Sequence, residues 1–506
     1  MITEAGVKQL RLKFPGDEGL LFRDLSFEVG QGEKVLLLGP SGCGKSTLLQ
    51  VLTGIIPRSV EVPMKHEDIT LPSSWGYVFQ DPDTQFCMPF VDEELAFVLE
   101  NLQVPRAEMP QRIRHYLELA GLRLDDIHTP INALSQGMKQ RLAIASVLAL
   151  EPDVLFLDEP TALLDPEGTE QVWETIKAVG RDKTVLIVEH KIDSIVDFVD
   201  RVVLFDDQGR ILGDGGKNEV FDRYKQQLID YGIWYPGVWD DYSARHPQPE
   251  AEPLLPASGN PLLSLDAFAG YRGKTEKLFV QKADVRPGEW ITVVGHNGAG
   301  KSTLLLSLMQ LIRTSGSYKV NGRDAAQVDD LASQLAYVFQ NPEFQFVTNS
   351  VYDEVAYTLR LDRLPEKEVA EKTKRLLGLF ELTGKSAQHP YLLSMGQKRR
   401  LSVACAIVKE QPVLLLDEPT FGQDAKNTFA MLEKLEEWRR HGTTIVMVTH
   451  DREIVDRFAT RIWTVAGGKL ASDCLASPRR EKEGQPADAC AGTVRSSEAP
   501  AGIGRG

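Results

Sequence analysis

The stretch GPSGCGKSTLL at residues 39–49 returns as GHNGAGKSTLL at residues 295–305. Each copy contains the pattern GxxxxGK[ST], follows an apolar run and opens a helical pattern, which is the context of a phosphate-binding loop. The glycines let backbone amides close on phosphate oxygens, the lysine meets the β and γ charges, and the serine hydroxyl holds Mg²⁺. Because the two copies lie in register, 256 residues apart, a chance match is negligible.

Four further pairs repeat in the same order. They are YVFQDP at 77–82 with YVFQNP at 337–342, LSQGMKQR at 134–141 with LSMGQKRR at 393–400, VLFLDEPT at 154–161 with VLLLDEPT at 413–420, and His190 with His450. Short apolar runs alternate with helical patterns in both halves. The sequence therefore predicts two copies of one α/β nucleotide-handling domain, each doubly wound around a mainly parallel sheet.

A proline-rich segment divides the 506 residues. We expect a first domain over 1–232, an extended linker over 233–260, a second domain over 261–471 and a disordered tail over 472–506. Prolines at 247, 249, 253, 256 and 261, within the linker and at its end, favour extended backbone there. The tail holds few apolar residues with which to form a core.

Composition excludes several classes of function. The chain has 57 basic and 72 acidic residues, a net charge of -15, so it lacks the positive surface of a dedicated nucleic-acid binder or of a protein held by anionic lipid. Its five cysteines form no CxxC pair, which argues against a zinc site or a disulfide framework. No apolar run approaches the roughly 18 residues that span a bilayer. A membrane role would therefore depend on a partner protein.

A serine-glycine pair and then an acidic pair follow each phosphate loop in the sequence. Asp158 and Asp417 are expected to support the metal, while Glu159 and Glu418 face an attacking water. Ser135 with Gly137, and Ser394 with Gly396, begin helices, where free amides and the positive dipole end attract an anion. A plain helix cap would also explain the serines. Both serines stand 23 residues ahead of the aspartates, which favours anion binding.

These motifs resemble those of the ATP-binding-cassette (ABC) ATPases over nearly all of both halves. The resemblance implies ATP and Mg²⁺ as cofactors and a glutamine loop and a switch histidine in each half. It implies that each parallel sheet core carries an antiparallel β subdomain and a helical signature subdomain. It also implies that two cassettes pack head to tail, so that the phosphate loop of one closes on ATP with the signature of the other. One chain with both halves could then form both sites.

The resemblance carries over to particular positions. The catalytic residues would be Glu159, Glu418, His190, His450, Gln80 and Gln340. Nucleotide contacts would come from Gly39, Pro40, Ser41, Gly42, Cys43, Gly44, Lys45, Ser46 and Thr47, from Gly295, His296, Asn297, Gly298, Ala299, Gly300, Lys301, Ser302 and Thr303, and from the signature residues Ser135, Gly137, Ser394 and Gly396. The Mg²⁺ ligands would be Ser46, Ser302, Gln80, Gln340, Asp158 and Asp417. Phe14 and Tyr271 would stack on adenine, although an ordinary strand aromatic explains Phe14 nearly as well.

Several positions depart from the family pattern. Gln136 and Met395 replace a signature glycine, and Met138 replaces the final glutamine, so equal turnover at the two sites is in doubt. Cys43 lies beside Lys45 in the first loop, where positive charge and a helix start favour a reactive thiolate. The alternative is that Cys43 is an inert small filler.

A narrower likeness follows the glutamines, in QDPDTQF at 80–86 and QNPEFQF at 340–346, with acidic-aromatic runs at 92–97 and 353–357. It resembles the ATPases of energy-coupling-factor vitamin and metal importers. Together with FGQD at 421–424 and the fused halves, it is most similar to the duplicated form linked to thiamine-precursor uptake. The partners would be a transmembrane coupling protein and a substrate-binding membrane subunit, with no nucleic acid and no direct lipid insertion. The chain would then sit at the cytoplasmic face of the membrane, with Phe86, Phe90, Phe344 and Phe346 as candidate contacts.

Other interpretations stay open. A soluble tandem-cassette ribosome factor would carry a long charged linker, whereas the segment here is short and proline-rich. A duplicated monosaccharide importer ATPase usually has a degraded second acid position, and Glu418 is intact. The segments after the glutamines could also serve only to pack the helical subdomain. Neither the transported substrate nor the identity of the partners follows from the sequence.

Overall fold

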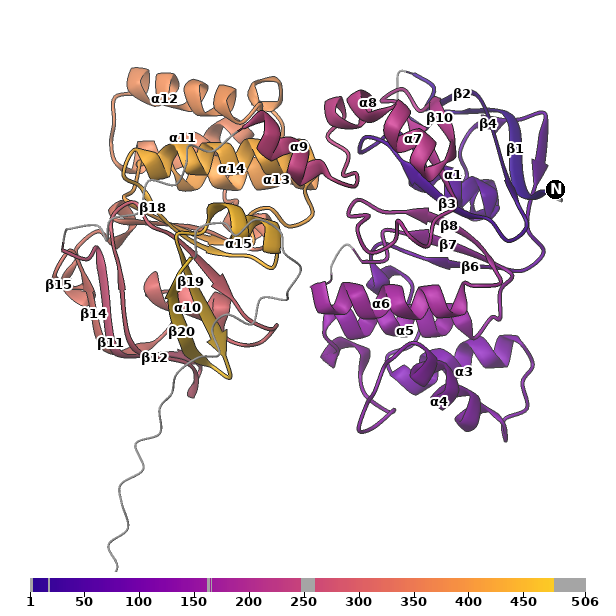
Figure 1. Cartoon of the computed structure of the whole chain (residues 1–506), viewed down its shortest axis with the longest axis horizontal. Coiled ribbons are helices and arrows are strands. Elements are labelled where there is room, and N and C mark those ends of the chain that lie inside the picture. The colour runs from indigo at the N-terminus through magenta and orange to yellow at the C-terminus, as the bar shows by residue number, and fades with distance from the viewer. Residues whose placement is uncertain (1–2, 17–18, 162–163, 165, 247–259, 477–506) are drawn as a thin grey trace, which may run out of the picture. The chain divides into compact units, whose positions relative to one another are not determined.

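The computed structural model describes residues 3–16, 19–161, 164, 166–246 and 260–476. The chain divides into two compact units. The first comprises residues 1–247 with 420–433, and the second comprises residues 248–419 with 434–506. Figure 1 labels the helices and strands of both units.

The first unit contains two sheets. A small antiparallel sheet joins β1 (Thr3–Leu12), β2 (Phe22–Gly30), β4 (Met64–Lys65) and β5 (Asp68–Thr70). A six-stranded sheet has the order β10-β9-β3-β8-β7-β6. Its strands are β3 (Lys34–Leu38), β6 (Trp75–Val78), β7 (Val154–Asp158), β8 (Thr184–Val188), β9 (Arg201–Phe205) and β10 (Ile211–Gly216). All neighbours in this sheet are parallel except β9 and β10.

The first unit also contains α-helices and short 3₁₀ helices. They are α1 (Lys45–Leu52), α2 (Ile55–Arg58), α3 (Val91–Asn101), α4 (Met109–Leu119), α5 (Gln136–Leu148), α6 (Pro166–Val179), α7 (Lys217–Arg223), α8 (Lys225–Asp230) and α9 (Val238–Arg245), with short 3₁₀ helices η1 (Pro82–Thr84) and η2 (Ile131–Ala133). Helices α3, α4 and α5 pack on one another, which is the predicted helical subdomain.

The second unit repeats this plan in one ten-stranded sheet. Its strands are β11 (Leu263–Arg272), β12 (Thr275–Val285), β13 (Trp290–Val294), β14 (Thr314–Val320), β15 (Arg323–Asp324), β16 (Leu335–Val338), β17 (Val413–Asp417), β18 (Thr444–Val448), β19 (Arg461–Ala466) and β20 (Lys469–Leu475). Strands β16, β17, β18, β13 and β19 run parallel, as their counterparts do in the first unit.

The helices of the second half follow the same order. They are α10 (Lys301–Leu308), α11 (Val351–Leu361), α12 (Glu366–Leu379), α13 (Met395–Ala406), α14 (Ala425–Arg440) and α15 (Arg452–Phe458), with 3₁₀ helices η3 (Ala325–Gln327), η4 (Leu331–Ser333), η5 (Pro342–Gln345), η6 (Thr383–Lys385) and η7 (Pro390–Leu392). The predicted tandem α/β fold is confirmed.

Buried parallel strands explain where the chemistry gathers. Every residue of β7, β8, β17 and β18 is buried, as expected for a sheet covered on both faces. The carboxyl ends of parallel strands meet at one edge, where such folds bind ligands. The loop after β3, the acids that end β7 and the histidine after β8 therefore meet there.

Two boundary expectations need correction. Residues 238–245 of the expected extended linker form helix α9, because Trp239 and Tyr242 bury their rings against Phe429 in the same unit. Strand β20 continues to Leu475, inside the expected disordered tail, because it pairs with β19. Residues 247–259 and 477–506 lie outside the described residues.

Candidate functional site

The first phosphate loop joins β3 to α1. Gly44 begins the helix at φ 103°, a conformation that glycine adopts without strain. A Cβ at Gly44 would lie 2.7 Å from Phe22 Cζ, so the loop packs too closely for a larger residue. Lys45 Nζ donates to the carbonyl oxygens of Gly39 and Pro40 at 2.8 and 3.0 Å. The ammonium is thus held over the loop.

The second loop has the same construction between β13 and α10. Gly300 has φ 110°, and a Cβ there would lie 2.9 Å from the Lys277 carbonyl oxygen. Lys301 Nζ donates to the carbonyl oxygens of Gly295 and His296 at 2.6 and 3.0 Å. Both units therefore place a lysine at a helix start, where an anion is stabilised.

Asp158 ends β7 beside the first loop. The hydroxyls of Ser46 and Tyr77 donate to its two carboxylate oxygens, each at 2.8 Å. Burial raises the pKa of Asp158, although both hydroxyl hydrogen bonds oppose the rise. An acidic side chain with this surrounding gains from a nearby cation, which would stabilise its charged form.

Glu159 follows with a positive φ of 48°, an unusual conformation for a side-chain-bearing residue and one that clusters at functional sites. Gln80 Nε2 donates to Glu159 Oε2 at 2.8 Å, and His190 Nε2 lies 3.0 Å from Oε1. Burial opposes ionisation, but the hydrogen bond and charge of His190 outweigh it and lower the pKa of Glu159. The carboxylate is therefore ionised at neutral pH and available to accept a proton.

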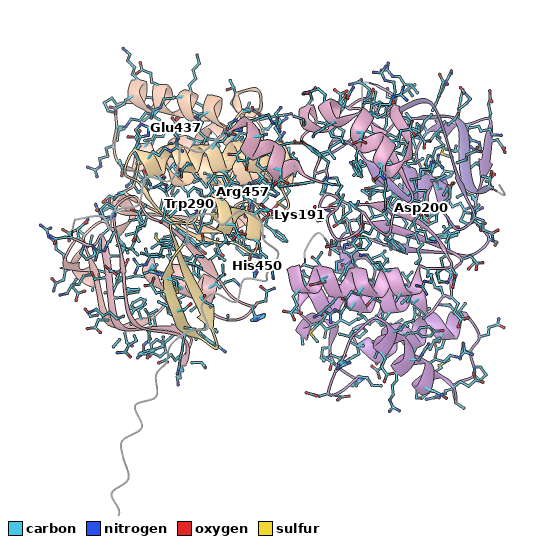
Figure 2. All side chains as sticks on the ribbon, viewed as in Figure 1. Lys191, Asp200, Trp290, Glu437, His450 and Arg457 are labelled. Carbon is cyan, nitrogen blue, oxygen red and sulfur yellow. The ribbon has the colours of Figure 1, made fainter. Side chains whose placement is uncertain are left out.

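The second acid pair has the same partners in a looser arrangement. The Tyr337 hydroxyl lies 3.3 Å from Asp417, and Gln340 Nε2 lies 3.4 Å from Glu418. His450, which Figure 2 labels, has its Nε2 3.2 Å from Glu418. Burial raises the pKa of Asp417, opposed by the Ser302 hydroxyl. Within the described part of the chain, Asp417 Oδ1 is buried without a hydrogen-bond partner.

The signature serines cap helices. Ser135 Oγ accepts from the Met138 amide at 3.3 Å and Ser394 Oγ from the Gln397 amide at 3.4 Å. The capping role is thus present in the structure. Met395, in the place of a family glycine, is 53 % exposed, so its side chain projects beside Ser394.

The candidate adenine residues remain predictions. Phe14 is half-buried against the core of the first unit, as an ordinary strand aromatic would be. The Tyr271 hydroxyl lies 3.2 Å from Ser315 Oγ, and the Arg313 guanidinium lies 5.3 Å from its ring centre.

The expectation of a reactive Cys43 is wrong. Its side chain is 2 % exposed, and this burial raises the pKa of the thiol despite the opposing charge of Lys45. A buried, neutral thiol is a poor nucleophile. Cys43 is the small core filler that the sequence offered as its alternative.

We accordingly expect a maleimide at neutral pH to modify Cys87, which is exposed, well before Cys43. Site-resolved mass spectrometry of the native protein measures both rates in one sample. The denatured protein is the control, in which both cysteines should react alike. Modification of native Cys43 as fast as Cys87 would contradict the burial.

The sequence missed three residues near the acids. Tyr77 and Tyr337 bind the aspartates, and their place three residues before each glutamine was a usable signal. Glu189, beside His190, is 5 % exposed and accepts from the Thr161 hydroxyl. Burial, together with the charges of Glu159 and Asp158, raises the pKa of Glu189 to about 8. Thr449 occupies this position in the second half, so the two sites differ here.

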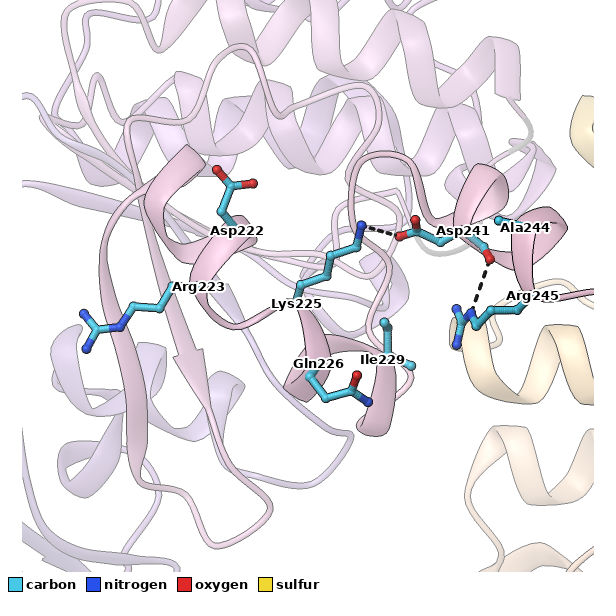
Figure 3. A pocket seen from close by; sticks show the side chains of 8 residues that line it. All are labelled: Asp222, Arg223, Lys225, Gln226, Ile229, Asp241, Ala244 and Arg245. Carbon is cyan, nitrogen blue, oxygen red and sulfur yellow. Dashed lines mark hydrogen bonds and ion pairs between the residues drawn. The ribbon is translucent and has the colours of Figure 1, made fainter.

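A surface pocket in the first unit does not belong to this site. Figure 3 shows it between α7, α8 and α9, with a volume of about 490 Å³. Lys225 and Asp241 pair across it at 2.8 Å, so its charges largely cancel. No phosphate-loop or acid-pair residue lines it.

Two findings concern membranes and metals. In the part of the chain that the structure describes, no helix is both long and apolar enough to cross a bilayer. The same residues contain no group of three or more His, Cys, Asp or Glu side chains that could hold a metal by themselves.

Comparisons with known proteins agree with this geometry. The family model described as ABC transporter matches residues 22–162 and 280–421. A Bacillus subtilis protein provisionally named an HMP/thiamine import ATP-binding protein, YkoD, is 36 % identical over 92 % of this chain and 90 % of its own. A Streptococcus pneumoniae protein provisionally named an ABC transporter ATP-binding protein is 33 % identical over 92 % and 90 %. A solved archaeal ribosome recycling factor, aABCE1, is similar with a TM-score of 0.63 over 92 % of this chain and 90 % of its own, but at 19 % identity it shows only the fold.

Proposed function

Because this chain belongs to the ABC transporter family, whose ATPases hydrolyse ATP to drive transport, we propose that it powers an energy-coupling-factor importer for thiamine or a precursor of thiamine. The observation that carries the ATPase role is duplicated. Each unit surrounds a strand-end glutamate with a glutamine and a histidine beside a phosphate-loop lysine. The substrate class is supported by the relative that is 36 % identical over most of both chains.

The residues fit Mg²⁺. Ser46 Oγ already contacts Asp158, and Asp417 Oδ1 is a buried carboxylate oxygen without a protein partner in the described chain. Serine, carboxylate and amide oxygens suit this hard cation, which also takes phosphate oxygens. Ser46, Asp158 and Gln80 would hold it in the first unit, and Ser302, Asp417 and Gln340 in the second. When bound, Mg²⁺ neutralises charge on the phosphates.

The protein's own groups would then divide the work. Lys45 and Lys301 leave their loop carbonyls for the β and γ phosphates and neutralise charge there. Glu159 and Glu418 accept a proton from the water that attacks the terminal phosphorus. His190 and His450 hold these carboxylates in place. We further propose, from the family resemblance, that Ser135 and Ser394 each act on the nucleotide bound by the other cassette.

The chain would work at the cytoplasmic face of the membrane through a transmembrane coupling protein that itself binds a substrate-binding subunit. We assign the contact with the coupling protein to two docking segments, residues 82–90 and 342–350. In the second segment Phe344 is 75 % and Val347 67 % exposed, and Leu392 nearby is 77 % exposed. The nearby acids Glu343 and Asp353 are already paired with Lys398 and Arg360, so a partner helix with apolar residues would fit this surface.

Two of the expected contacts need revision. Phe346 is only 8 % exposed, because its ring packs inside the helical subdomain near Tyr391. Phe90 is half-buried and stacks on His128, with ring centres 4.1 Å apart. The exposed apolar surface therefore lies mainly in the second segment, where Phe344 and Val347 stand in the places of Thr84 and Cys87 in the first.

We expect Phe344→Asp with Val347→Asp to weaken binding to the membrane partner about 10²- to 10⁴-fold, since each buried apolar side chain contributes about 1.5–3 kcal/mol and the two together about 3–6 kcal/mol. Co-purification of the tagged chain with membrane proteins measures the loss. Leu311→Asp is the matched control, because Leu311 is also exposed but lies outside both docking segments. Unchanged co-purification of the double variant would contradict the assignment.

The proposed function is tested by purifying the tagged chain from membranes and identifying the integral proteins that accompany it. We expect a coupling protein and a small-molecule-binding membrane protein. Recovery with ribosomes and without integral proteins would instead favour the translation-factor alternative.

A further inference from the structure

Each unit ties its docking segment to the helix that begins at its signature serine. Lys139 Nζ, on α5, donates to both carboxylate oxygens of Asp83, on η1, at 2.7 and 2.9 Å. Lys398 Nζ, on α13, donates to Glu343, on η5, at 2.6 Å. The same bridge therefore occurs twice, although the acid differs in length between the two halves.

A second tie lies one turn further along each helix. Gln85 Nε2 donates to the Ala143 carbonyl oxygen at 3.0 Å. Gln345 Nε2 donates to the Ser402 carbonyl oxygen at 2.9 Å, and Ser402 Oγ donates back to Gln345 Oε1 at 2.7 Å. Two attachment points restrain rotation as well as separation, so each docking segment and its helix should move together.

The lysines are placed in the turns that carry the serines. The amides of Lys139 and Lys398 donate to the carbonyl oxygens of Ser135 and Ser394, at 2.9 and 2.8 Å. A cation in the first turn of a helix opposes the helix dipole, so helix stability does not explain either lysine. Their side chains are only 14 % and 11 % exposed. The carboxylates of Asp83 and Glu343 offset the positive charges of these two lysines.

The far side of each docking segment is also held. The Glu94 carboxylate is buried and accepts from the Cys87 and Met88 amides at 2.9 and 2.8 Å. The Glu354 carboxylate is buried and accepts from the amides of residues 347 and 348 at 3.0 and 2.7 Å. In each unit, hydrogen bonds thus connect the docking segment to the helix on its far side and to the signature turn, so a displacement of the docking segment should reach the signature turn.

We propose that Lys139 and Lys398 are positioning residues whose bridges to Asp83 and Glu343 transmit motion between the docking segments and the signature turns (residues 135–139 and 394–398). This proposal rests on the proposed function for the identity of the partner, but the bridges themselves belong to each unit alone. The carboxylates of both bridges reach solvent, at 45 % and 34 % exposed, and ion pairs of this kind add little stability. Their removal should therefore uncouple the two ends without unfolding the subdomain.

The test combines Lys139→Met with Lys398→Met and has two readouts. The first uses the chain alone. Adding Mg-ATP should slow amide hydrogen exchange in the signature turns and in the docking segments of the wild type, but only in the signature turns of the variant. The second uses the chain with its membrane partner in vesicles, where uptake per ATP hydrolysed should fall roughly fivefold or more. The control is Lys372→Met, a lysine paired with Glu368 on α12.

Exchanging the acid and the lysine of each bridge distinguishes a role in transmitting motion from a role in packing alone. Asp83→Lys with Lys139→Asp, together with Glu343→Lys and Lys398→Asp, should restore coupled exchange and most of the uptake per ATP. The proposal would be overturned if Mg-ATP slowed exchange in the docking segments of the methionine variant as much as in the wild type. It would also be overturned if a lower melting temperature of the variant accounted for the whole loss of uptake per ATP. If the wild type shows coupled exchange but no partner or uptake, the positioning role stands and the proposed importer function fails.

Discussion

Replacing both Glu159 and Glu418 by Gln should lower steady-state ATP hydrolysis about 10²- to 10⁴-fold, the usual range for loss of a general base. The amide keeps the size of the side chain and can still contact Gln80 and His190, but it cannot accept a proton from water. Nucleotide affinity should persist, since neither glutamate lies in a phosphate loop. Phosphate release measures hydrolysis, and titration with a fluorescent ATP analogue measures binding.

The matched control is Glu118→Gln with Glu371→Gln, exposed glutamates on α4 and α12, which should leave hydrolysis unchanged. The single variants separate the two sites. Because Gln340 and His450 lie farther from Glu418 than their counterparts lie from Glu159, we expect Glu159→Gln to cause the larger loss. A double variant that kept more than about a tenth of the wild-type rate would refute the assigned base.

Lys45→Ala and Lys301→Ala should each weaken ATP binding about 10- to 100-fold at their own loop, because hydrogen bonds to charged groups contribute about 1.5–3 kcal/mol. The loop backbone should persist, since the glycines that shape it remain. Titration of the two sites with a fluorescent ATP analogue measures the effect. Lys65→Ala, an exposed lysine of β4, is the control.

These variants also test the proposed pairing of the cassettes. If each signature acts on the other cassette's nucleotide, Lys45→Ala and Ser394→Ala should affect one site and be strongly non-additive, while Lys45→Ala and Ser135→Ala should add. Coupling of Lys45 to Ser135 with additivity toward Ser394 would show that each signature serves its own phosphate loop.

The fold was predictable because the signals that mark its strands, loops and helices are local in the sequence. A phosphate loop must follow a strand and precede a helix, and the strands before Asp158 and Asp417 are short apolar runs that can only be buried. Because each motif occurs in both halves of the chain, each inference was supported twice. Helix α9 was missed because prolines further along the segment outweighed its aromatic residues, and the burial of Trp239 and Tyr242 depends on Phe429, nearly two hundred residues away in the sequence.

The candidate site was predictable in its residue types but not in its surroundings. Whether Cys43 is reactive depends on burial, which the neighbouring Lys45 does not reveal. Likewise, Phe344 and Phe346 stand two residues apart in one motif, yet one is exposed and the other is packed. The pKa of Glu189 depends on the charges of Asp158 and Glu159, which only folding brings beside it.

The most direct measurement is ATP-dependent uptake by vesicles that contain the chain with the integral proteins that co-purify with it. Radiolabelled thiamine and HMP are supplied on the face of the membrane opposite to the one where the chain binds ATP. We predict accumulation of at least one of them that requires ATP and Mg²⁺ and disappears with Glu159→Gln and Glu418→Gln. Hydrolysis without accumulation of either compound would contradict the proposed import function, and accumulation that survives the double substitution would contradict this chain as its motor.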